Sequence, residues 1–380
     1  MDFTLDDEQQ ALREAVRGLI TKKYGDFEVR RQTVAADPGF DEQTWQRLAE
    51  LGALGLPFAE EDGGAGAGPV EVAIVATELG RVIAPEPYLH AVALAGGLVA
   101  DAGSPEQRTD LLGALSSGAK VLAFAHDEPG SRWAPTATAV TASGAGDEWT
   151  LNGTKEPVQA GVRADVLVVS AALPDGGTGL FAVDGAAGGV QRDGYATHDG
   201  ARAARVTFTD APATPLGEGG DATEVIEAGL DRARIIAANQ ALGAMEVALQ
   251  TTSGYLTSRK QFGVTLNTFQ ALTFRAADMY VALELTRSIV DWATMVLAEG
   301  STEEVAQAAS RAALQVSKAS RHIGQESIQL HGGIGMTAEY SIGSYTSHLT
   351  ALDHLFGDGN LHLARLAEQV TTYSDVDPLG

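Results

Sequence analysis

The sequence predicts a mostly helical α+β protein of three domains: an N-terminal helical domain (residues 1–118), a small middle β barrel (119–216) and a C-terminal four-helix bundle (217–380). One observation is where proline falls, since twelve of the 13 prolines lie between Pro38 and Pro215 and the other is Pro378. Proline costs roughly 3 kcal/mol inside a helix, so the proline-free stretch after Pro215 predicts long helices. A second observation is that helical periodicity at both ends gives way to short β-rich runs between them.

The N-terminal domain has the pattern of amphipathic helices. Thr4 and Asp7, three residues apart, form a candidate capping pair for the first helix. An apolar stripe follows at Leu12, Val16, Leu19 and Ile20. Further helices are expected at Glu42–Leu51, Pro69–Val82 and Pro105–Ser117.

The middle domain consists of short runs rich in β-formers, separated by Gly, Asp and Pro. The expected strands are Val121–His126, Thr136–Ala142, Trp149–Leu151, Val166–Ala172, Gly179–Val183 and Ala204–Thr209. Strands this short are typical of a small barrel and do not suggest a parallel doubly wound sheet.

The C-terminal domain has the pattern of long bundle helices. Apolar residues recur at spacings of three and four along the first of them, at Ile235, Ala238, Leu242, Met245 and Leu249. The helices are expected at about Thr223–Arg259, Phe269–Glu299 and Thr302–Leu330.

Composition excludes several classes of function. The net charge of -24 repels phosphate backbones and anionic lipid headgroups, so we expect neither nucleic acid nor membrane as a partner. The chain has no cysteine, which excludes disulfides, thiolate metal sites and cysteine nucleophiles, and no metal site is predicted. The N-terminus has no signal-like n-region or h-region, and no apolar stretch reaches 18 residues. The expected location is cytoplasmic.

Five short motifs occur in order along the chain. They are Trp149–Lys155 (WTLNGTK) with Ala164-Asp165 after it, Asp231 with Arg234, Arg259–Gly263 (RKQFG), Phe269-Gln270, and Gln329–Gly335 (QLHGGIG). In this order and spacing they resemble the acyl-CoA dehydrogenase family over nearly the whole chain. The resemblance is in particular to the non-catalytic subunits of heterotetrameric members from actinobacteria.

The resemblance implies the acyl-CoA dehydrogenase fold, an acyl-CoA substrate, FAD as the cofactor and electron-transfer flavoprotein as the electron acceptor. In the family, the C-terminal motifs hold the FAD of the neighbouring subunit. The matching cofactor-binding residues are Arg259, Gln261, Phe262, Phe269, Gln270, Gln329, Gly332 and Gly333. Asp231 and Arg234 match a pair at the thioester end of the substrate channel.

Three of these motifs also have simpler interpretations. Gln329–Gly335 would suit a loop that ends a helix, although its adjacent glycines also let a cofactor approach the backbone closely, which favours flavin contact. Arg259–Gly263 would suit a helix C-terminus, with basic side chains facing the dipole and Gly263 as the C′ residue. In the functional interpretation, the Arg259 guanidinium forks onto the FAD pyrophosphate and Phe262 packs on the adenosine. Asp231 and Arg234, three residues apart, would also form an intrahelical ion pair, and the sequence leaves both roles open.

The flavin-cradling segments depart from the family pattern. Members usually have Thr-Glu-Pro-Gly-x-Gly-Ser-Asp where this chain has Asp127–Ala134 (DEPGSRWA), so only Glu-Pro-Gly survives. Pro157 replaces a family tryptophan that lies against the flavin ring, and proline offers neither an aromatic face nor an N–H. Trp133 is a candidate substitute ring.

The family's catalytic base is also missing. A Glu-Gly-Thr normally stands where this chain has Phe356-Gly357-Asp358, and its Glu takes the α-proton while the flavin takes the β-hydride. Relatives that place the Glu on the first bundle helix do so at positions that are Ala233 and Asn239 here. Asp358 and Glu246 remain as weak candidate replacements, so no catalytic residue is assigned.

Three functions are therefore considered. The first is a subunit that lends FAD-binding residues to a homologous catalytic partner in an α2β2 heterotetramer, acting on bulky thioesters such as steroid side-chain CoA esters. The second is a self-sufficient homotetrameric dehydrogenase whose base is displaced to Asp358. The third is a flavin-free acyl-CoA-binding scaffold. Retention of the Arg259 and Gln329 motifs together with loss of the base favours the first.

Overall fold

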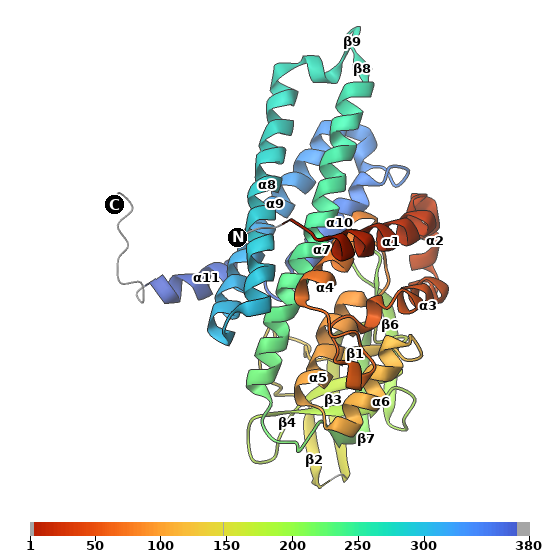
Figure 1. Cartoon of the computed structure of the whole chain (residues 1–380), viewed down its shortest axis with the longest axis vertical. Coiled ribbons are helices and arrows are strands. Elements are labelled where there is room, and N and C mark those ends of the chain that lie inside the picture. Colours follow the sequence, from red (N-terminus) through yellow and green to blue (C-terminus); the bar gives the residue numbers. More distant parts are fainter. Residues whose placement is uncertain (1–3, 147, 371–380) are drawn as a thin grey trace.

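The structure, a computed structural model, describes residues 4–146 and 148–370. Helices pack beside a small sheet at one end, and three long helices project away from it (Figure 1). This arrangement of N-terminal helices, a middle barrel-like sheet and C-terminal helices confirms the predicted fold class.

Within the described residues, the N-terminal part contains six α-helices and one helical segment of π type. Their bounds are α1 (Asp7–Tyr24), α2 (Phe27–Ala35), α3 (Glu42–Glu50), α4 (Pro69–Arg81), the π segment η3 (Leu89–Gly96), α5 (Gly97–Ala102) and α6 (Pro105–Ser116), with the short 3-10 turns η1 (Ala53–Gly55) and η2 (Glu60–Asp62) before α4. The cap of α1 is Asp6, which accepts the Gln9 N–H at 2.8 Å, so the expected Thr4–Asp7 capping pair is wrong. A carboxylate one residue before the helix reaches the N3 amide that a capping side chain must bind.

The middle part is a seven-stranded sheet that closes on itself. Its strands are β1 (Leu122–Ala125), β2 (Thr141–Ala145), β3 (Glu148–Gln159), β4 (Val166–Ala172), β5 (Thr178–Asp184), β6 (Val190–Ala196) and β7 (Arg202–Pro215). The pairing β4-β2-β3-β7-β5 returns to β4, because β4 and β5 are also antiparallel neighbours. The enclosed core is apolar, with Leu151, Val169, Phe181 and Phe208 buried in it.

Four strands differ from the sequence expectation. Strand β2 begins at Thr141 and not at Thr136, and β7 extends beyond both expected ends to Arg202 and Pro215. β3 is much longer than Trp149–Leu151 and continues past Pro157, where a bulge between Lys155 and Val158 shifts its register against β7. Strand β6 was not expected, because its residues are largely exposed and lack apolar alternation. It pairs through its backbone with β7 at the sheet edge, and its Arg192 side chain donates to the Ala164 carbonyl oxygen, so it leaves little hydrophobic signal in the sequence.

The C-terminal part is built on three long helices. They are α7 (Thr223–Ser258), α8 (Gln270–Glu299) and α9 (Thr302–His331), followed by the 3-10 turn η5 (Gly332–Met336), α10 (Ile342–Asp353) and α11 (Gly359–Gln369). Helix α10 packs against α9 and α7 and is the fourth helix of the bundle. Their shared core includes Met245, Leu283, Ala312 and Ile323.

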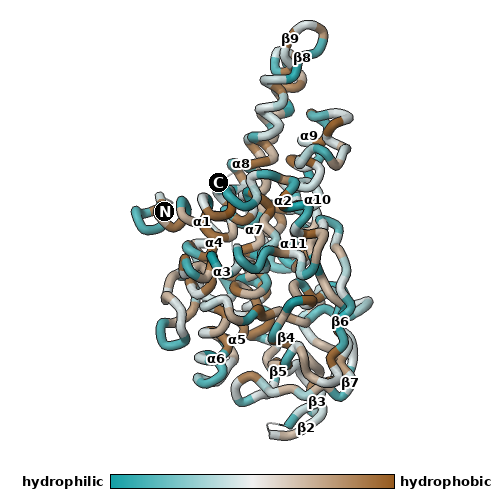
Figure 2. The backbone as a smooth tube through the Cα atoms, turned by 90° about the vertical axis from the view of Figure 1, so that its right-hand side faces the viewer, coloured by the Kyte–Doolittle hydropathy of each residue, from teal (hydrophilic) through white to brown (hydrophobic). Residues whose placement is uncertain are grey.

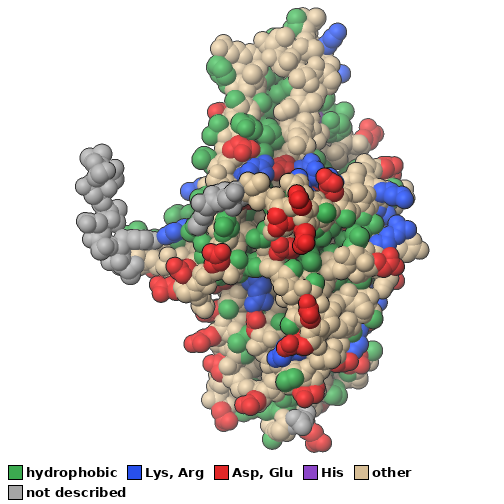
Figure 3. All heavy atoms as spheres, viewed as in Figure 1, with side chains coloured by type: hydrophobic (Ala, Val, Ile, Leu, Met, Phe, Trp, Pro, Cys, Tyr) green, Lys and Arg blue, Asp and Glu red, His purple; other side chains and the backbone are tan. Residues whose placement is uncertain are grey.

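The first two long helices end in a projecting tip. Between them lie a two-residue-loop hairpin, β8 (Lys260–Gln261) and β9 (Val264–Thr265), and the 3-10 turn η4 (Leu266–Thr268). Figure 2 shows this tip as a narrow extension beyond the rest of the chain. Hydrophobic side chains are exposed along the projecting helices (Figure 3), among them Phe274, Val281 and Leu285 of α8 at 55–59% exposure.

Candidate functional site

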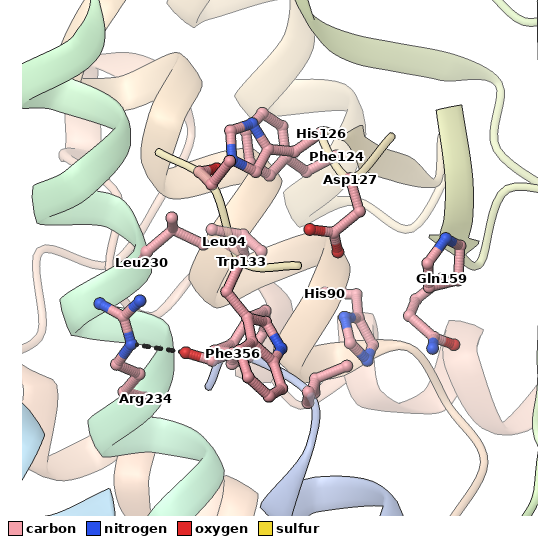
Figure 4. A pocket seen from close by; sticks show the side chains of 13 residues that line it. His90, Leu94, Phe124, His126, Asp127, Trp133, Gln159, Leu230, Arg234 and Phe356 are labelled. Atoms are coloured by element: carbon pink, nitrogen blue, oxygen red, sulfur yellow. Dashed lines mark hydrogen bonds between the residues drawn. The ribbon is translucent and has the colours of Figure 1, made fainter. Parts of the chain in front are cut away.

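A pocket lies where the N-terminal helices, the sheet and the bundle meet, with an empty volume of about 580 Å³ (Figure 4). We call it the central pocket. Its wall comes from η3, the end of β1 and the loop after it, the end of β3, helix α7, and the segment between α10 and α11. Its lining includes His90, His126, Asp127, Trp133, Pro157, Gln159, Arg234 and Phe356.

Phe356 forms one wall of the pocket and is fixed through its backbone. Its carbonyl oxygen accepts a 2.9 Å hydrogen bond from Arg234 Nε, drawn as a dashed line in Figure 4. The same guanidinium contacts Asp231 through Nη1 at 2.5 Å. Asp231 and Arg234 are both buried, at 7% and 6% exposure, so the intrahelical ion pair that the sequence left open is present. Arg234 also lines the pocket, so its position does not exclude contact with a ligand.

Trp133 also lines the pocket (Figure 4). Its backbone adopts a positive φ of 51°, which is unfavourable for a bulky residue. Its indole N–H donates to the carbonyl oxygen of His354 at 3.0 Å, and the Arg132 guanidinium lies 5.3 Å from the ring centroid. These contacts join the loop after β1 to the end of α10 and hold the indole in the pocket.

Three titratable side chains line the pocket. Asp127, directly after β1, supplies the carboxylate, and burial raises its pKa to about 6. Burial lowers the pKa of His126 to about 4, and the ring is fixed by Ser170 Oγ at 2.9 Å and the Ala134 carbonyl at 2.8 Å. Burial also lowers the pKa of His90 to about 4, so both imidazoles are neutral near pH 7.

The surviving Glu-Pro-Gly remnant serves the structure of the barrel. Glu128 is 4% exposed and accepts the backbone N–H groups of Ala139 and Val140 at 2.8 and 2.9 Å. It pairs with Lys155 Nζ at 2.9 Å, and Lys155 is fully buried. Burial opposes the ionisation of Glu128, but these hydrogen bonds and Lys155 outweigh it and lower its pKa to about 2. The motif is retained here by a buried ion pair that faces away from the pocket lining.

The candidate replacement bases lie outside the central pocket. Asp358 is the N-cap of α11, and its Oδ1 accepts the N–H groups of Asn360 and Leu361 at 3.0 and 2.9 Å. Hydrogen bonding from Leu361 is the largest effect on its carboxyl and lowers its pKa. Glu246 is paired with Arg81 and Arg287 in a separate groove between the N-terminal helices and the bundle.

The two alternative helix positions also face elsewhere. Ala233 is fully buried in the apolar core of the N-terminal part. Asn239 donates to Thr294 Oγ1 on α8 at 2.9 Å and lines the groove that contains Glu246. A carboxylate at either position would not reach the central pocket without rearrangement.

The RKQFG motif lies at the projecting tip. Arg259 caps α7, and Lys260, Gln261 and Phe262 continue into the hairpin, all exposed. Phe262 and Gly263 both have positive φ, 53° and 84°, as a type I′ hairpin turn requires. Gly263 is thus a turn residue of the hairpin and not the C′ residue of α7. The Phe262 side chain is 92% exposed and contacts only the edge of Phe269, with ring centroids 6.2 Å apart.

The QLHGGIG motif lies beside the same end of the bundle. His331 is buried, and its ring centroid lies 4.5 Å from that of Tyr255 in a tilted arrangement. Tyr255 lies on α7, one helical turn before Arg259. Gln329, Gly332 and Gly333 around it are exposed. The structure therefore gathers the predicted cofactor-binding residues, Phe269 and Gln270 included, at the projecting end. Arg259 follows Arg234 by 25 residues of α7, a rise of about 37 Å, so this end is remote from the central pocket.

Sequence reasoning missed several pocket residues. Asp127, His90 and Gln159 line the pocket but were not singled out. For Asp127 a signal existed, since a carboxylate stands immediately before the Glu-Pro-Gly remnant. For His90 there was none, because it lies in a helical segment of mostly apolar residues.

Within residues 4–146 and 148–370, no group of three or more His, Asp or Glu is arranged to hold a metal ion. None of the helices in these ranges is long and apolar enough to cross a membrane.

Comparisons with known proteins match both helical parts. The family model "Acyl-CoA dehydrogenase, N-terminal domain" matches residues 6–119, and "Acyl-CoA dehydrogenase, C-terminal domain" matches residues 220–371. The human mitochondrial short-chain specific acyl-CoA dehydrogenase is 33% identical over 77% of this chain and 74% of its own length.

Two solved structures are similar over nearly their whole length. A single-residue variant of the Tcur3481-Tcur3483 steroid ACAD is 32% identical with a TM-score of 0.88, covering 97% of this chain and 99% of that one. The ChsE4-ChsE5 complex from Mycobacterium tuberculosis is 26% identical with a TM-score of 0.89, covering 99% of this chain and all of that one (100%).

Proposed function

This chain belongs to the acyl-CoA dehydrogenase family, whose members are FAD-binding flavoproteins, and we propose that it is the subunit that completes the FAD site of a homologous catalytic partner. The proposal rests on one observation: the predicted cofactor-binding residues and the central pocket lie at different places in the chain. The predicted cofactor-binding residues lie at the projecting end, while the central pocket of the same chain has Phe356 at the position of the family base and Pro157 at the position of the family tryptophan.

The central pocket does not fit a flavin ring. The Trp133 indole and the Phe356 ring occupy its walls, and Pro157 lacks the N–H and the aromatic face of the family residue. The loop that would cradle the ring is tied to His354 by the indole. No step of the reaction is therefore assigned to this pocket.

The projecting end fits a cofactor supplied from outside. A Cβ atom added at Gly333 would meet no atom within 4 Å, and Gly333 does not have a positive φ. Neither packing nor backbone conformation within this protomer explains a glycine there, whereas close approach of a bound molecule does. At the same end of the bundle, the exposed Arg259 guanidinium can form the paired hydrogen bonds that suit a pyrophosphate.

In the assembled enzyme, bound FAD would accept the hydride that leaves the acyl-CoA during α,β-desaturation. The partner supplies the base and the flavin cradle, and this chain supplies Arg259, Phe262, Gln329 and the two glycines that position the cofactor. We propose an α2β2 heterotetramer with electron-transfer flavoprotein as the acceptor. Similarity to a steroid ACAD and to the two-component ChsE4-ChsE5 complex supports a heteromer and a bulky, steroid-like acyl group.

The two other functions have less support. A self-sufficient enzyme with Asp358 as its base would need that carboxylate in the central pocket, but Asp358 caps α11 outside it. Asp127 does line the pocket, but a base there would still lack a flavin cradle in the same chain. A flavin-free scaffold would leave the solvent-exposed Phe262 and the open space at Gly333 without a purpose.

The test is the flavin content of the purified chain, alone and co-expressed with a complete family member from the same genome. We expect almost no flavin absorbance and no acyl-CoA oxidation from the chain alone. With the partner we expect about one FAD for each pair of unlike chains, together with oxidation activity. One FAD per protomer and turnover by the isolated chain would show that the proposal is wrong.

A further inference from the structure

A second pocket, with an empty volume of about 800 Å³, adjoins the central pocket. We call it the charged pocket. It lies between α2, the loop before η3, the β6–β7 connection and α10. His90, Gln159 and Leu355 line both pockets. The charged pocket is remote from the projecting end and has no part in the proposed function.

Arg30 of α2 is the principal cation of this pocket. It is only 3% exposed, and its Nε donates to the Ile83 carbonyl oxygen at 2.6 Å. Its guanidinium also lies 5.9 Å from the Phe27 ring centroid. Its terminal nitrogens make no hydrogen bond or ion pair to any residue within the described ranges. A buried guanidinium normally has a carboxylate partner, so one anionic partner is lacking.

Glu86 faces the same pocket at 5% exposure. Its Oε1 accepts from the Tyr24 hydroxyl at 2.5 Å, while Oε2 is buried without a partner in the described structure. Burial raises the pKa of Glu86 to about 7. Near and below neutral pH, its Oε2 can therefore carry a proton and donate a hydrogen bond into the pocket.

The other charged side chains of the pocket have hydrogen-bond or ion-pair partners of their own. His348 Nδ1 lies 2.8 Å from Asp199 Oδ2, and Thr197 and Ala201 donate to the other oxygen of Asp199. Arg202 pairs with Asp37 at 3.2 Å at the rim, although its buried Nε is unpartnered. The Asp199 carboxylate also acts on the Arg30 charge through space, but it makes no hydrogen bond to the terminal nitrogens of Arg30 in the described structure.

We propose that the charged pocket binds the carboxylate group of a small organic acid, held by the terminal nitrogens of Arg30 with the Glu86 carboxyl group and Arg202 Nε as further donors. A planar carboxylate matches the two parallel N–H groups of a guanidinium. It also supplies the acceptor oxygens that the terminal nitrogens of Arg30 lack among the described residues. A phosphate dianion fits less well, because its second charge would face the nearby Asp199 and Glu86 carboxyl groups.

The test uses butyrate as the carboxylate probe, its neutral isostere butyramide, and inorganic phosphate. Binding to the full chain is measured by calorimetry near pH 6.5, with the partner present if the chain is isolated as a complex. The variants are Arg30→Gln and, as a matched control, Arg31→Gln. Arg31 is the next residue of α2, pairs with Glu28 and is 45% exposed.

We expect saturable butyrate binding that is at least tenfold weaker in Arg30→Gln and unchanged in Arg31→Gln, with no binding of butyramide. If Arg30→Gln does not fold, Arg202→Gln replaces it, with an expected loss of about threefold or more. The inference is overturned if butyrate does not bind saturably, if butyramide or phosphate binds as well, or if the folded pocket variant binds like the wild type. Because flavin content is not involved, these outcomes are independent of the proposed function.

Discussion

The Nε of Arg234 donates a 2.9 Å hydrogen bond to the carbonyl oxygen of Phe356. The arginine thereby fixes the backbone at the position where the family carries its base. Its other contact, to Asp231, lies on its own helix. The position is thus held in place even though its side chain is a phenyl ring, and the loss of the carboxylate needs no rearrangement of the loop.

Replacing Phe356 by Glu should not create an active enzyme from the isolated chain. Arg234 is already paired, and Trp133 and Pro157 would still obstruct a flavin ring. A half-buried carboxylate in an apolar wall should lower the free energy of unfolding by about 1–2 kcal/mol, measured by urea titration. Phe356→Leu, which keeps the wall apolar, should cost less. Flavin-dependent oxidation by isolated Phe356→Glu would contradict the central-pocket argument.

Asp358 should behave as a helix cap. Replacing it by Ala removes the acceptor for the Asn360 and Leu361 amides and should lower unfolding free energy by about 1 kcal/mol. Asn can still cap the helix, so Asp358→Asn should be nearly as stable as the wild type. Neither change should affect acyl-CoA oxidation by the assembled complex. A stable Asp358→Asn complex that has lost oxidation would instead identify this residue as the base.

Arg259 and its neighbour Lys260 should differ in their effect on FAD. Both are exposed at the projecting end, so neither substitution by Ala should change folding. Loss of the charge-assisted hydrogen bonds in Arg259→Ala should weaken FAD binding to the complex by about 1.5–3 kcal/mol, which is roughly ten- to a hundredfold. Lys260→Ala should change it little. If the two substitutions weaken FAD binding equally in a titration, Arg259 contributes only a positive charge and makes no specific hydrogen bonds to the cofactor.

Asp127 should make stability depend on pH. Its raised pKa of about 6 means that the folded state keeps a proton that the unfolded chain has already lost. The free energy of unfolding should therefore fall as pH rises from about 4 to about 6 and stay lower above this range. The Asp127→Asn variant lacks this titrating carboxyl group. Relative to the wild type, its free energy of unfolding should therefore rise by about 1–2 kcal/mol as the pH increases from about 4 to about 6. Parallel urea curves at pH 4.5 and 7.5 would measure the difference, and a pH-independent difference would contradict it.

The long helices were predictable because their signal is local. The expected and observed ends of α7, α8 and α9 agree within one residue, since apolar periodicity and proline both act along the chain. Strand β6 and the extension of β3 were missed, because exposed edge residues and a bulge at a proline are stabilised by backbone pairing with β7.

Part of the candidate site could be predicted from residue types alone. Phe356 and Ala233 cannot supply a carboxylate in any fold, and Pro157 cannot supply a stacked aromatic ring, so the absence of these groups at these positions follows from the residue types alone. The environment of Asp358 was not readable. Only the start of α11 immediately after it makes its carboxylate a capping group.

The sequence by itself determined the three-part fold, the family resemblance and the absence of a base at the expected positions, because these depend on local periodicity and on the chemistry of single residues. Tertiary structure decided what those residues meet. It placed Trp133 against the end of α10, brought the Arg259 and Gln329 motifs to one exposed end, and left Arg30 buried without an anionic partner among the described residues. Each of these depends on segments that are distant in the chain becoming neighbours, and side-chain burial and charge compensation are set only by such contacts.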